Sequence, residues 1–344
     1  MTTDTNNHTG DSRRLRARVA AVGVALVTAA AAAGLAFAQS RSGPVGTGVV
    51  VIETSLGYQG GRAAGTGMVL TSSGVILTNN HVIRGATTIR VVVPGTGRSY
   101  QAKVVGYDIT DDVAVLRVSG GSKLKAVKLG TSTRLVVGQL VKAVGNAGGS
   151  GSLVRTAGQI TGLSRTITVN DESGGTSTLR NLIETSAALQ PGDSGGPLLD
   201  SAGKVIGMDS AAASSGPYSD ISTLDGYAIP INRALAIAKA ITAGNASATV
   251  HIGSTAFLGI SAASAGAQPG AVVASVVPGG PADTAGLRSG DVITAIDGTS
   301  IRSAGAVSRV ILRKKPGATV AVTYLDATGA TQTVRATLVS GPPQ

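Results

Sequence analysis

The sequence predicts a mainly β protein built from more than one domain, and three observations indicate this fold class. The chain has 344 residues, a length that suits about two domains. Val and Thr are abundant, whereas aromatic residues make up only 2% of the chain. Clusters of Gly, Ser, Asn and Asp recur roughly every ten residues, a spacing typical of the turns between short strands in sandwiches and barrels.

The first segment, residues 1–38, has the pattern of an export signal. Four arginines lie between positions 13 and 18 and precede the uncharged, Ala- and Val-rich residues 19–36. Ala36-Phe37-Ala38 then supplies an A-x-A cleavage site before Gln39. The apolar stretch is intermediate in length between a signal-peptide core and a spanning helix, so both cleavage and retention as a membrane anchor stay open. In either case we expect the remaining chain to be secreted or held in the cell envelope.

Composition excludes several functional classes. The chain contains no cysteine, which removes thiol nucleophiles, disulfides and Cys-based zinc sites. Its three histidines are His8, His81 and His251, and His8 is separated from the exported part, so we expect no metal site and no cofactor. The net charge is +11, but the basic residues are scattered and few aromatic side chains are available to stack on bases. We therefore expect a solvated basic surface and no nucleic-acid partner.

A Gly-flanked serine is the first candidate for chemistry. Ser194 lies in LQPGDSGGPLLD, residues 189–200, between Asp193 and a pair of glycines. A serine hydroxyl is a weak nucleophile at neutral pH and needs a base that a third group orients. Because the exported chain has few histidines, the search for that base is short.

His81 is the candidate base. It lies in GTGMVLTSSGVILTNNHVI, residues 65–83, where residues 65–70 and 75–78 read as two strands joined by a Ser-Ser-Gly turn. His81 follows the second strand, where the chain is expected to leave the sheet. His251 lies much further along the chain, in a small and polar stretch that reads as a linker.

The candidate acid comes from YDITDDVAVLRV, residues 107–118. Asp112 directly precedes the apolar strand 113–118, whereas Asp108 and Asp111 read as turn residues. Asp112 is therefore the acid best placed to be buried against the histidine. The resulting chain order, His81, Asp112, Ser194, is that of chymotrypsin-type proteases and differs from the orders of subtilisins and α/β-hydrolases.

TNNHV, TDDVAVL and GDSGGPL together resemble the HtrA/Deg branch of trypsin-like serine proteases, and especially its exported actinobacterial members. The resemblance covers residues 44–241 and implies a chymotrypsin-like pair of six-stranded antiparallel β-barrels with the triad at their junction. It also implies a serine endopeptidase that acts on polypeptide substrates, and relatives of this kind are often trimeric homo-oligomers. One departure is Asp193, because HtrA-type proteases commonly carry Asn before the nucleophile.

The expected roles follow from the triad chemistry. His81 accepts the Ser194 proton, Asp112 fixes the imidazole tautomer, and the backbone N–H groups of Gly192 and Ser194 form the oxyanion hole. The resemblance further implies a substrate pocket with Ala188 at its base, and Ser210 hydrogen-bonded behind Asp112. Its expected residues are Ala188, Ser210, Ala211 and Ala212. None of them carries a charge, so we expect cleavage after small or medium apolar residues.

A second domain is expected after a helix over 229–244 and a linker over 246–255, with the protease domain at 39–245. Residues 256–340 resemble a PDZ domain of the HtrA type, chiefly through GPADTAGLRSGDVITAIDG and FLGI. The resemblance implies that the amides of Leu258, Gly259 and Ile260 bind a peptide C-terminal carboxylate while the peptide adds as a strand. A helix over 304–312 and strands over 319–324 and 331–338 complete the expected domain.

Two interpretations remain to be separated. The glycine-rich AVGNAGGSG, residues 143–151, lacks the Gly-Lys-Ser/Thr of a phosphate loop and reads as a turn between strands. The alternative function is a peptide-binding chaperone or adaptor with a vestigial protease site. For Asp193, the open possibilities are hydrogen bonds from loop amides, a cation from Arg155, Arg165 or Arg180, or exposure in a loose loop.

Overall fold

The computed structural model describes residues 46–58, 60–120, 123–170, 176–210, 226–264 and 269–344. The predicted export signal at 1–38 lies outside these residues, as do Ala211 and Ala212 of the predicted substrate pocket. Within the described ranges, no helix has both the length and the apolar character needed to cross a membrane.

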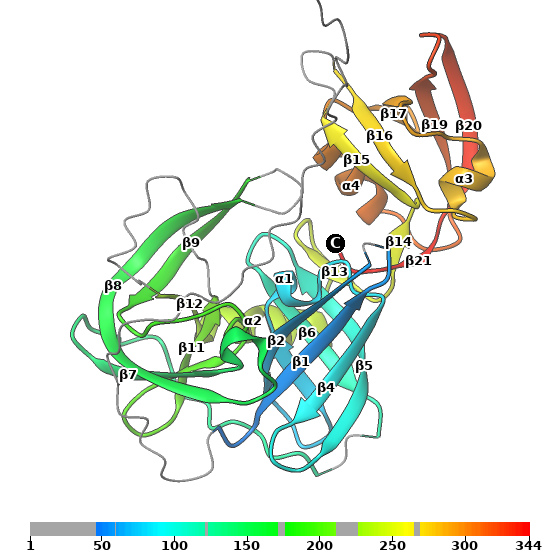
Figure 1. Ribbon diagram of the computed structural model, residues 1–344. Coiled ribbons are helices and arrows are strands. Elements are labelled where there is room, and N and C mark those ends of the chain that lie inside the picture. The colour runs from blue at the N-terminus through cyan, green and yellow to red at the C-terminus, as the bar shows by residue number, and fades with distance from the viewer. Residues whose placement is uncertain (1–45, 59, 121–122, 171–175, 211–225, 265–268) are drawn as a thin grey trace, which may run out of the picture. The chain divides into compact units, whose positions relative to one another are not determined.

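The first barrel contains six antiparallel strands (Figure 1). The strands follow the order β5-β4-β1-β2-β3-β6, and pairing of β5 with β6 closes the ring. Their apolar positions form one core that includes the fully buried Ile52, Ile76 and Leu116. The bounds are β1 Val49–Leu56, β2 Gly61–Val69, β3 Val75–Thr78, β4 Thr88–Val93, β5 Arg98–Asp108 and β6 Val113–Val118, with the short helix α1 Asn80–Ile83 between β3 and β4.

The second barrel is a closed ring in the order β10-β11-β12-β9-β8-β7. It has its own core around Ile160, Ile183 and Leu198. A further apolar cluster joins first-barrel side chains such as Met68 to second-barrel ones such as Met208, so the two barrels pack directly on each other. The bounds are β7 Leu140–Gly145, β8 Val154–Asn170, β9 Thr176–Thr185, β10 Pro197–Leu199, β11 Val205–Ser210 and β12 Gly226–Pro230, with a 3₁₀ turn at Ala147–Gly149.

Helix α2, Ile231–Thr242, follows the second barrel and buries one face in the cluster between the barrels. Its buried residues recur at helical spacing, which is why the sequence predicted a helix over 229–244. The structure adds a strand inside the predicted linker. Residues Val250–Ile252 form β13, which pairs with β5 of the first barrel, and the ring of His251 lies 4.9 Å from that of Tyr107.

The C-terminal domain has a separate core formed by strands and two helices. Its main sheet runs β15-β16-β17-β19-β20, and β14 pairs with β21. The predicted helix over 304–312 is confirmed by α4, and the two predicted strands match β19 and β20 closely. The bounds are β14 Thr255–Phe257, β15 Ile260–Ser264, β16 Ala271–Val276, α3 Pro281–Ala285, β17 Val292–Ile296, β18 Thr299–Ser300, α4 Ala304–Leu312, β19 Thr319–Leu325, β20 Thr331–Thr337 and β21 Val339–Gly341.

The segment after β21 returns to the first barrel. Pro342 and Pro343 are buried, and the carbonyl of Pro343 accepts a hydrogen bond from the Gly85 amide at 2.8 Å. The side-chain amide of Asn80 donates to the carbonyl of Gln344 at 3.0 Å. These contacts lie on α1 and the residues that follow it, next to His81 in the chain.

Candidate active site

His81 is held by Asp112 at two points. The His81 backbone N–H donates to Oδ1 of Asp112 at 2.9 Å, and Nδ1 of the ring lies 2.7 Å from Oδ2. The histidine side chain is 42% exposed, whereas that of the aspartate is only 10% exposed. The carboxylate therefore fixes both the position of α1 and the orientation of a ring that substrate can still reach.

The backbone conformation of Asp112 favours an aspartate at this position. Asp112 has φ +53°, in the left-handed region that Asp and Asn adopt more readily than most other residues. Its carbonyl accepts hydrogen bonds from the Asn79 side chain at 2.9 Å and from the Asn80 amide at 3.3 Å. The tight turn before β6 thus joins the acid to the residues that precede the histidine.

The other two acids of this segment, Asp108 and Asp111, lie at the turn before β6, as the sequence predicted. Asp108 is buried and accepts hydrogen bonds from the amides of Thr110 and Asp111, which makes it a turn former. Asp111 forms an ion pair with Arg233 of α2. Asp108 and Asp111 thus bond the turn backbone and α2, respectively.

Thr66 of β2 fastens the Ser194 loop to the first barrel. The Thr66 amide donates to the carbonyl of Ser194 at 2.9 Å, and its hydroxyl donates to the carbonyl of Gly192 at 2.7 Å. The same hydroxyl accepts a hydrogen bond from the amide of Asn146 at 2.9 Å. The role of Thr66 is not predicted from the sequence, because nothing near this threonine in β2 indicates its contact with Gly192, 126 residues away.

Gly195 lets the loop approach the strand that leads to His81. It has φ +85°, and a Cβ added there would lie 2.1 Å from the Thr66 carbonyl oxygen and 2.3 Å from the Thr78 hydroxyl oxygen. Thr78 ends β3 and precedes His81 by three positions. Glycine is required here for both conformation and space, and the result is that Ser194 is held beside the chain that carries the histidine.

Several amides of the Ser194 loop form hydrogen bonds inside the protein. The Asp193 amide donates to the Gln190 carbonyl at 2.9 Å, and the Gly195 amide donates to the Asp209 carbonyl at 2.8 Å. Gly192 has φ +100° and lies against the backbone of Asn146. Across the loop, the Ser210 hydroxyl donates to Oδ2 of Asp112 at 3.4 Å, as the resemblance implied.

Asp193 is buried and receives a loop amide, one of the three possibilities that the sequence left open. Its residue is 4% exposed, and its Oδ2 accepts a hydrogen bond from the Gln190 amide at 2.8 Å. Burial raises the pKa of Asp193, and the Gln190 amide opposes that rise. None of the ion pairs within the described ranges involves Asp193, and Arg165 pairs with Glu184 instead.

The predicted substrate pocket is only partly described. Ala188 is half-buried at the start of the loop that leads to Ser194. Gly226 of β12 approaches this loop closely, since an added Cβ would lie 2.7 Å from the Leu189 side chain. The two further alanines of the prediction lie outside the described residues, so the pocket stays a prediction.

The predicted carboxylate loop of the C-terminal domain leads into a strand edge. Gly259 has φ +83°, and its carbonyl accepts a hydrogen bond from the Val277 amide at 2.9 Å. The Leu258 carbonyl accepts one from the Ala282 amide at 2.9 Å, and Ile260 begins β15. With both carbonyls turned into the domain, the loop has the geometry needed to turn amides outward.

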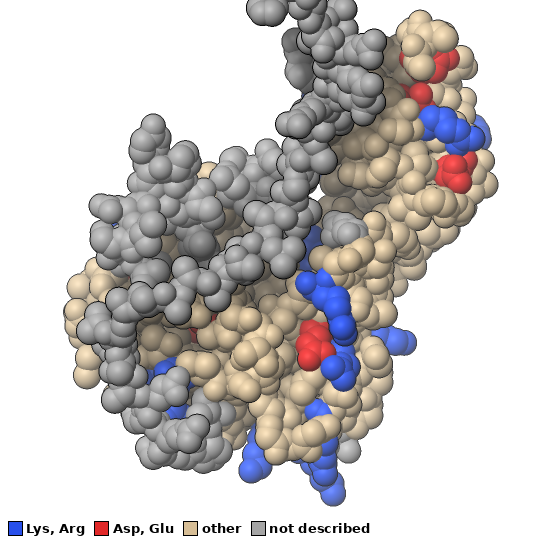
Figure 2. Space-filling view, viewed as in Figure 1, with Lys and Arg blue, Asp and Glu red and all other residues tan. Residues whose placement is uncertain are grey.

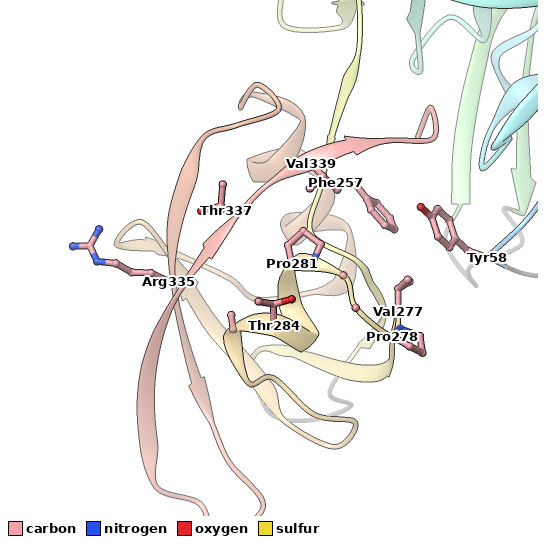
Figure 3. A pocket seen from close by; sticks show the side chains of 12 residues that line it. Tyr58, Phe257, Val277, Pro278, Pro281, Thr284, Arg335, Thr337 and Val339 are labelled. Carbon is pink, nitrogen blue, oxygen red and sulfur yellow. The ribbon is translucent and has the colours of Figure 1, made fainter.

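A pocket of about 450 Å³ is lined by this domain together with Tyr58, which follows β1 (Figure 3). Its wall includes Phe257, whose ring stacks on that of Tyr58 at 5.0 Å between ring centres. The three residues of the predicted carboxylate loop do not line it, and neither does α4. The pocket is therefore distinct from the peptide groove that the sequence predicts.

On the face in Figure 2, the Lys and Arg side chains of the described residues are scattered among uncharged ones. No group of three or more His, Asp or Glu residues in the described ranges is arranged to hold a metal ion.

The two barrels and the His81–Asp112 pair facing the Ser194 loop define a trypsin-like peptidase fold, here followed by a PDZ domain. Family comparison agrees, matching the trypsin-like peptidase domain over residues 65–208 and the PDZ domain over 256–338. The serine protease PepD of Mycobacterium tuberculosis is 38% identical over 84% of this chain and 63% of its own length. The putative serine protease HhoA of Synechocystis is 37% identical over 72% of this chain and 63% of its own length.

A solved structure of a variant of the HtrA-type protease AlgW, with a tripeptide, matches with a TM-score of 0.50 and 30% identity, over 87% of this chain and 95% of that one. The chain belongs to the HtrA/Deg family of trypsin-like serine proteases with a PDZ domain. It spans 63% of the length of each of the two curated relatives above.

Proposed function

We propose that the protein is a serine endopeptidase that cleaves unfolded or exposed polypeptides through an acyl-enzyme. The observation that carries the proposal is the double attachment of His81 to Asp112, with the Ser194 loop fastened beside it by Thr66. A carboxylate that binds both the amide and Nδ1 of one histidine leaves Nε2 as the atom that exchanges protons with a nucleophile.

In the proposed reaction, Nε2 of His81 accepts the Ser194 proton as Oγ attacks the peptide carbonyl, and then delivers it to the leaving amine. Asp112 holds the tautomer and stabilises the imidazolium that forms. Water attacks the acyl-enzyme in the second half, with His81 acting again as the base. The hydroxyl of Ser210 adds a third hydrogen bond to this carboxylate and helps to fix its orientation.

The oxyanion hole is proposed to consist of the N–H groups of Gly192 and Ser194. The amides of Asp193 and Gly195 are engaged by the carbonyls of Gln190 and Asp209, so neither of these two serves the oxyanion hole, and the assigned amides are the ones on either side of Asp193. An oxyanion-hole donor contributes on the order of 3 kcal/mol to transition-state stabilisation.

The C-terminal domain is proposed to bind peptide C-termini at Leu258–Ile260 and to use this contact for substrate engagement or regulation. The inward carbonyls of Leu258 and Gly259 support the assignment, because a loop fixed in that way directs amides outward. We further propose an exported protein, secreted or in the cell envelope. Two relatives, from Haemophilus influenzae and Halomonas elongata, are named as probable periplasmic proteases. Self-association as a trimer is part of the same proposal.

The experiment is labelling by a fluorophosphonate, with the modified residue mapped, together with an assay of unfolded-protein cleavage. We expect labelling at Ser194 in the unsubstituted protein, no label in Ser194→Ala, and cleavage only by the unsubstituted protein. The alternative, a peptide-binding chaperone or adaptor with a vestigial site, predicts that Ser194→Ala suppresses aggregation of unfolded proteins as well as the parent does and that neither protein cleaves. Absence of both label and cleavage in the parent overturns the proposed protease.

A further inference from the structure

Asp209 is a buried acid that the proposed mechanism does not use. It lies on β11 opposite Ala228 of β12 and is 0% exposed. Its side chain shares a strand face with Gly207, whose added Cβ would contact Ala228 and Ile183, so it points into the second barrel. Neither carboxylate oxygen of Asp209 has a hydrogen-bond partner among the described residues.

The backbone of Asp209 holds the loop that carries Ser194. Its carbonyl accepts the amide of Gly195 at 2.8 Å, and its amide donates to the carbonyl of Gly196 at 2.7 Å. The next residue, Ser210, donates to Asp112. A displacement of Asp209 therefore moves both the nucleophile loop and a hydrogen bond to the acid of the triad.

The charged group that acts on Asp209 is another acid. Asp193 lies close enough for its negative charge to oppose ionisation of Asp209. The other titratable groups on the surrounding strands are engaged or turned away. Tyr227 on β12 donates to Glu184 of β9, Arg165 of β8 pairs with the same glutamate, and Lys142 on β7 is exposed. No cation in the described ranges balances the pair of acids.

Two neighbouring buried carboxyls without a cation do not both ionise, because each charge loses its hydration and repels the other. Asp193 accepts a loop amide, which favours its charged form, whereas Asp209 has no such donor. Burial raises the pKa of Asp209 well above its usual range, and the charge of Asp193 raises it further. The proton therefore resides on Asp209.

We propose that Asp209 is a positioning residue that works as a neutral carboxylic acid, whose proton keeps the two buried acids together and so holds the Ser194 loop in place. The inference rests on the proposed protease function. Ionisation of Asp209 at high pH places two negative charges, those of Asp193 and Asp209, close together in the barrel. Their repulsion displaces Asp209, and the Ser194 loop moves with it because Gly195 and Gly196 are hydrogen-bonded to the backbone of Asp209.

Because the pKa of Asp209 is raised in the folded protein, the stability of the protein falls as the pH rises. Above about pH 4 an unfolded chain has lost this proton, while the folded protein keeps it. The folding equilibrium constant therefore falls about tenfold per pH unit from that point until the pKa of folded Asp209 is passed, and is then constant. We also expect kcat to fall at alkaline pH, where Asp209 of the folded protein releases its proton.

The test compares Asp209→Asn with Asp193→Asn and with Asp200→Asn, a turn acid of the same barrel that bonds the Lys204 amide. For each, the kcat profile between neutral and alkaline pH is measured on a saturating peptide. Thermal unfolding is followed against pH in the same variants on the Ser194→Ala background, where no self-cleavage occurs. Asp209→Asn imitates the neutral acid and should lack the alkaline fall of kcat and the tenfold-per-unit loss of stability.

Removing the neighbouring charge provides a second measurement that does not need Asp209→Asn to fold. Asp193→Asn should move the alkaline fall to lower pH, because it removes the repulsion that holds the proton on Asp209. Asp200→Asn should keep the parent profile. Because unfolding needs no catalysis, the stability slope tests the proton even if the protein proves not to be a protease.

Three results overturn the inference: an alkaline fall of kcat unchanged in Asp209→Asn, a stability slope unchanged in that variant, or no shift in Asp193→Asn. A fourth outcome is selective loss of cleavage after Lys or Arg in Asp209→Asn. It would mean that Asp209 is ionised and binds a substrate cation, and it also overturns the neutral acid.

Discussion

The two barrels contribute to the candidate site in different ways. The first barrel supplies side-chain chemistry, and its acid Asp112 has partners for both oxygens. The second barrel supplies backbone geometry, through a loop of glycines, and its buried acids have few partners or none. The difference teaches that the first barrel holds its acid by hydrogen bonds to both oxygens, whereas the second barrel leaves the carboxyl of Asp209 buried with no such partner in the described part of the chain.

The sharpest test of the first-barrel side of this contrast is Asp112→Asn. Asn tolerates φ +53°, so the fold should be retained while the histidine is held in the wrong tautomer. We expect kcat to fall roughly 10⁴-fold with little change in KM. The matched control is Asp111→Asn, which loses a half-buried ion pair to Arg233 but none of the hydrogen bonds between Asp112 and His81, and it should stay active. A crippled Asp111→Asn beside an active Asp112→Asn would show that the acid is misassigned.

On the second-barrel side, Gly195→Ala should disrupt the loop. The added Cβ would overlap the Thr66 carbonyl and the Thr78 hydroxyl at a residue with φ +85°. Strain and overlap together should lower the free energy of unfolding by about 3 kcal/mol. Denaturant unfolding measures the change.

The matched control is Gly203→Ala, at φ +72° with no atom within 4 Å of the added Cβ, and it should cost about 1 kcal/mol. Equal losses at the two glycines would mean that close packing of the loop on the first barrel is unimportant.

Substrate preference tests whether the second barrel presents an uncharged pocket. The base of the predicted pocket is Ala188, which offers no partner for a Lys or Arg side chain. We expect cleavage after Ala, Val or Leu, with about 10–200-fold differences between neighbouring apolar sizes. A peptide library read by mass spectrometry gives the profile, and a profile dominated by Lys and Arg contradicts the expectation.

The PDZ domain extends the comparison to a third region, where backbone amides are proposed to bind a peptide C-terminus. A peptide with a free C-terminal carboxylate should bind about tenfold more tightly than its C-terminal amide, because a hydrogen bond to a charged acceptor is worth about 1.5 kcal/mol or more. Calorimetric titration of both forms measures the ratio. Equal affinities would point to recognition of an internal segment instead of a C-terminus.

The sequence predicted those parts of the site that carry a local signal. Asp112 is predicted because it directly precedes an apolar strand, and the helix over 229–244 is predicted from its apolar spacing. Thr66, Asp209 and β13 were missed, because their contacts join residues far apart in the chain and appear only when the barrels close. Every residue of β11 is buried, so its sequence pattern does not reveal that Asp209 lies near Asp193.

The strand β13 and the segment after β21 have a consequence for how the PDZ domain is attached. The chain leaves the first barrel after Ile252, forms the domain, and returns to the same barrel at Pro343 and Gln344. The segments on both sides of the domain therefore contact the first barrel, and one broken peptide bond in the loops of the domain would leave each fragment with its own contact to that barrel. Limited proteolysis of such a loop by an added protease should therefore yield two fragments on a denaturing gel while the size of the native protein stays unchanged.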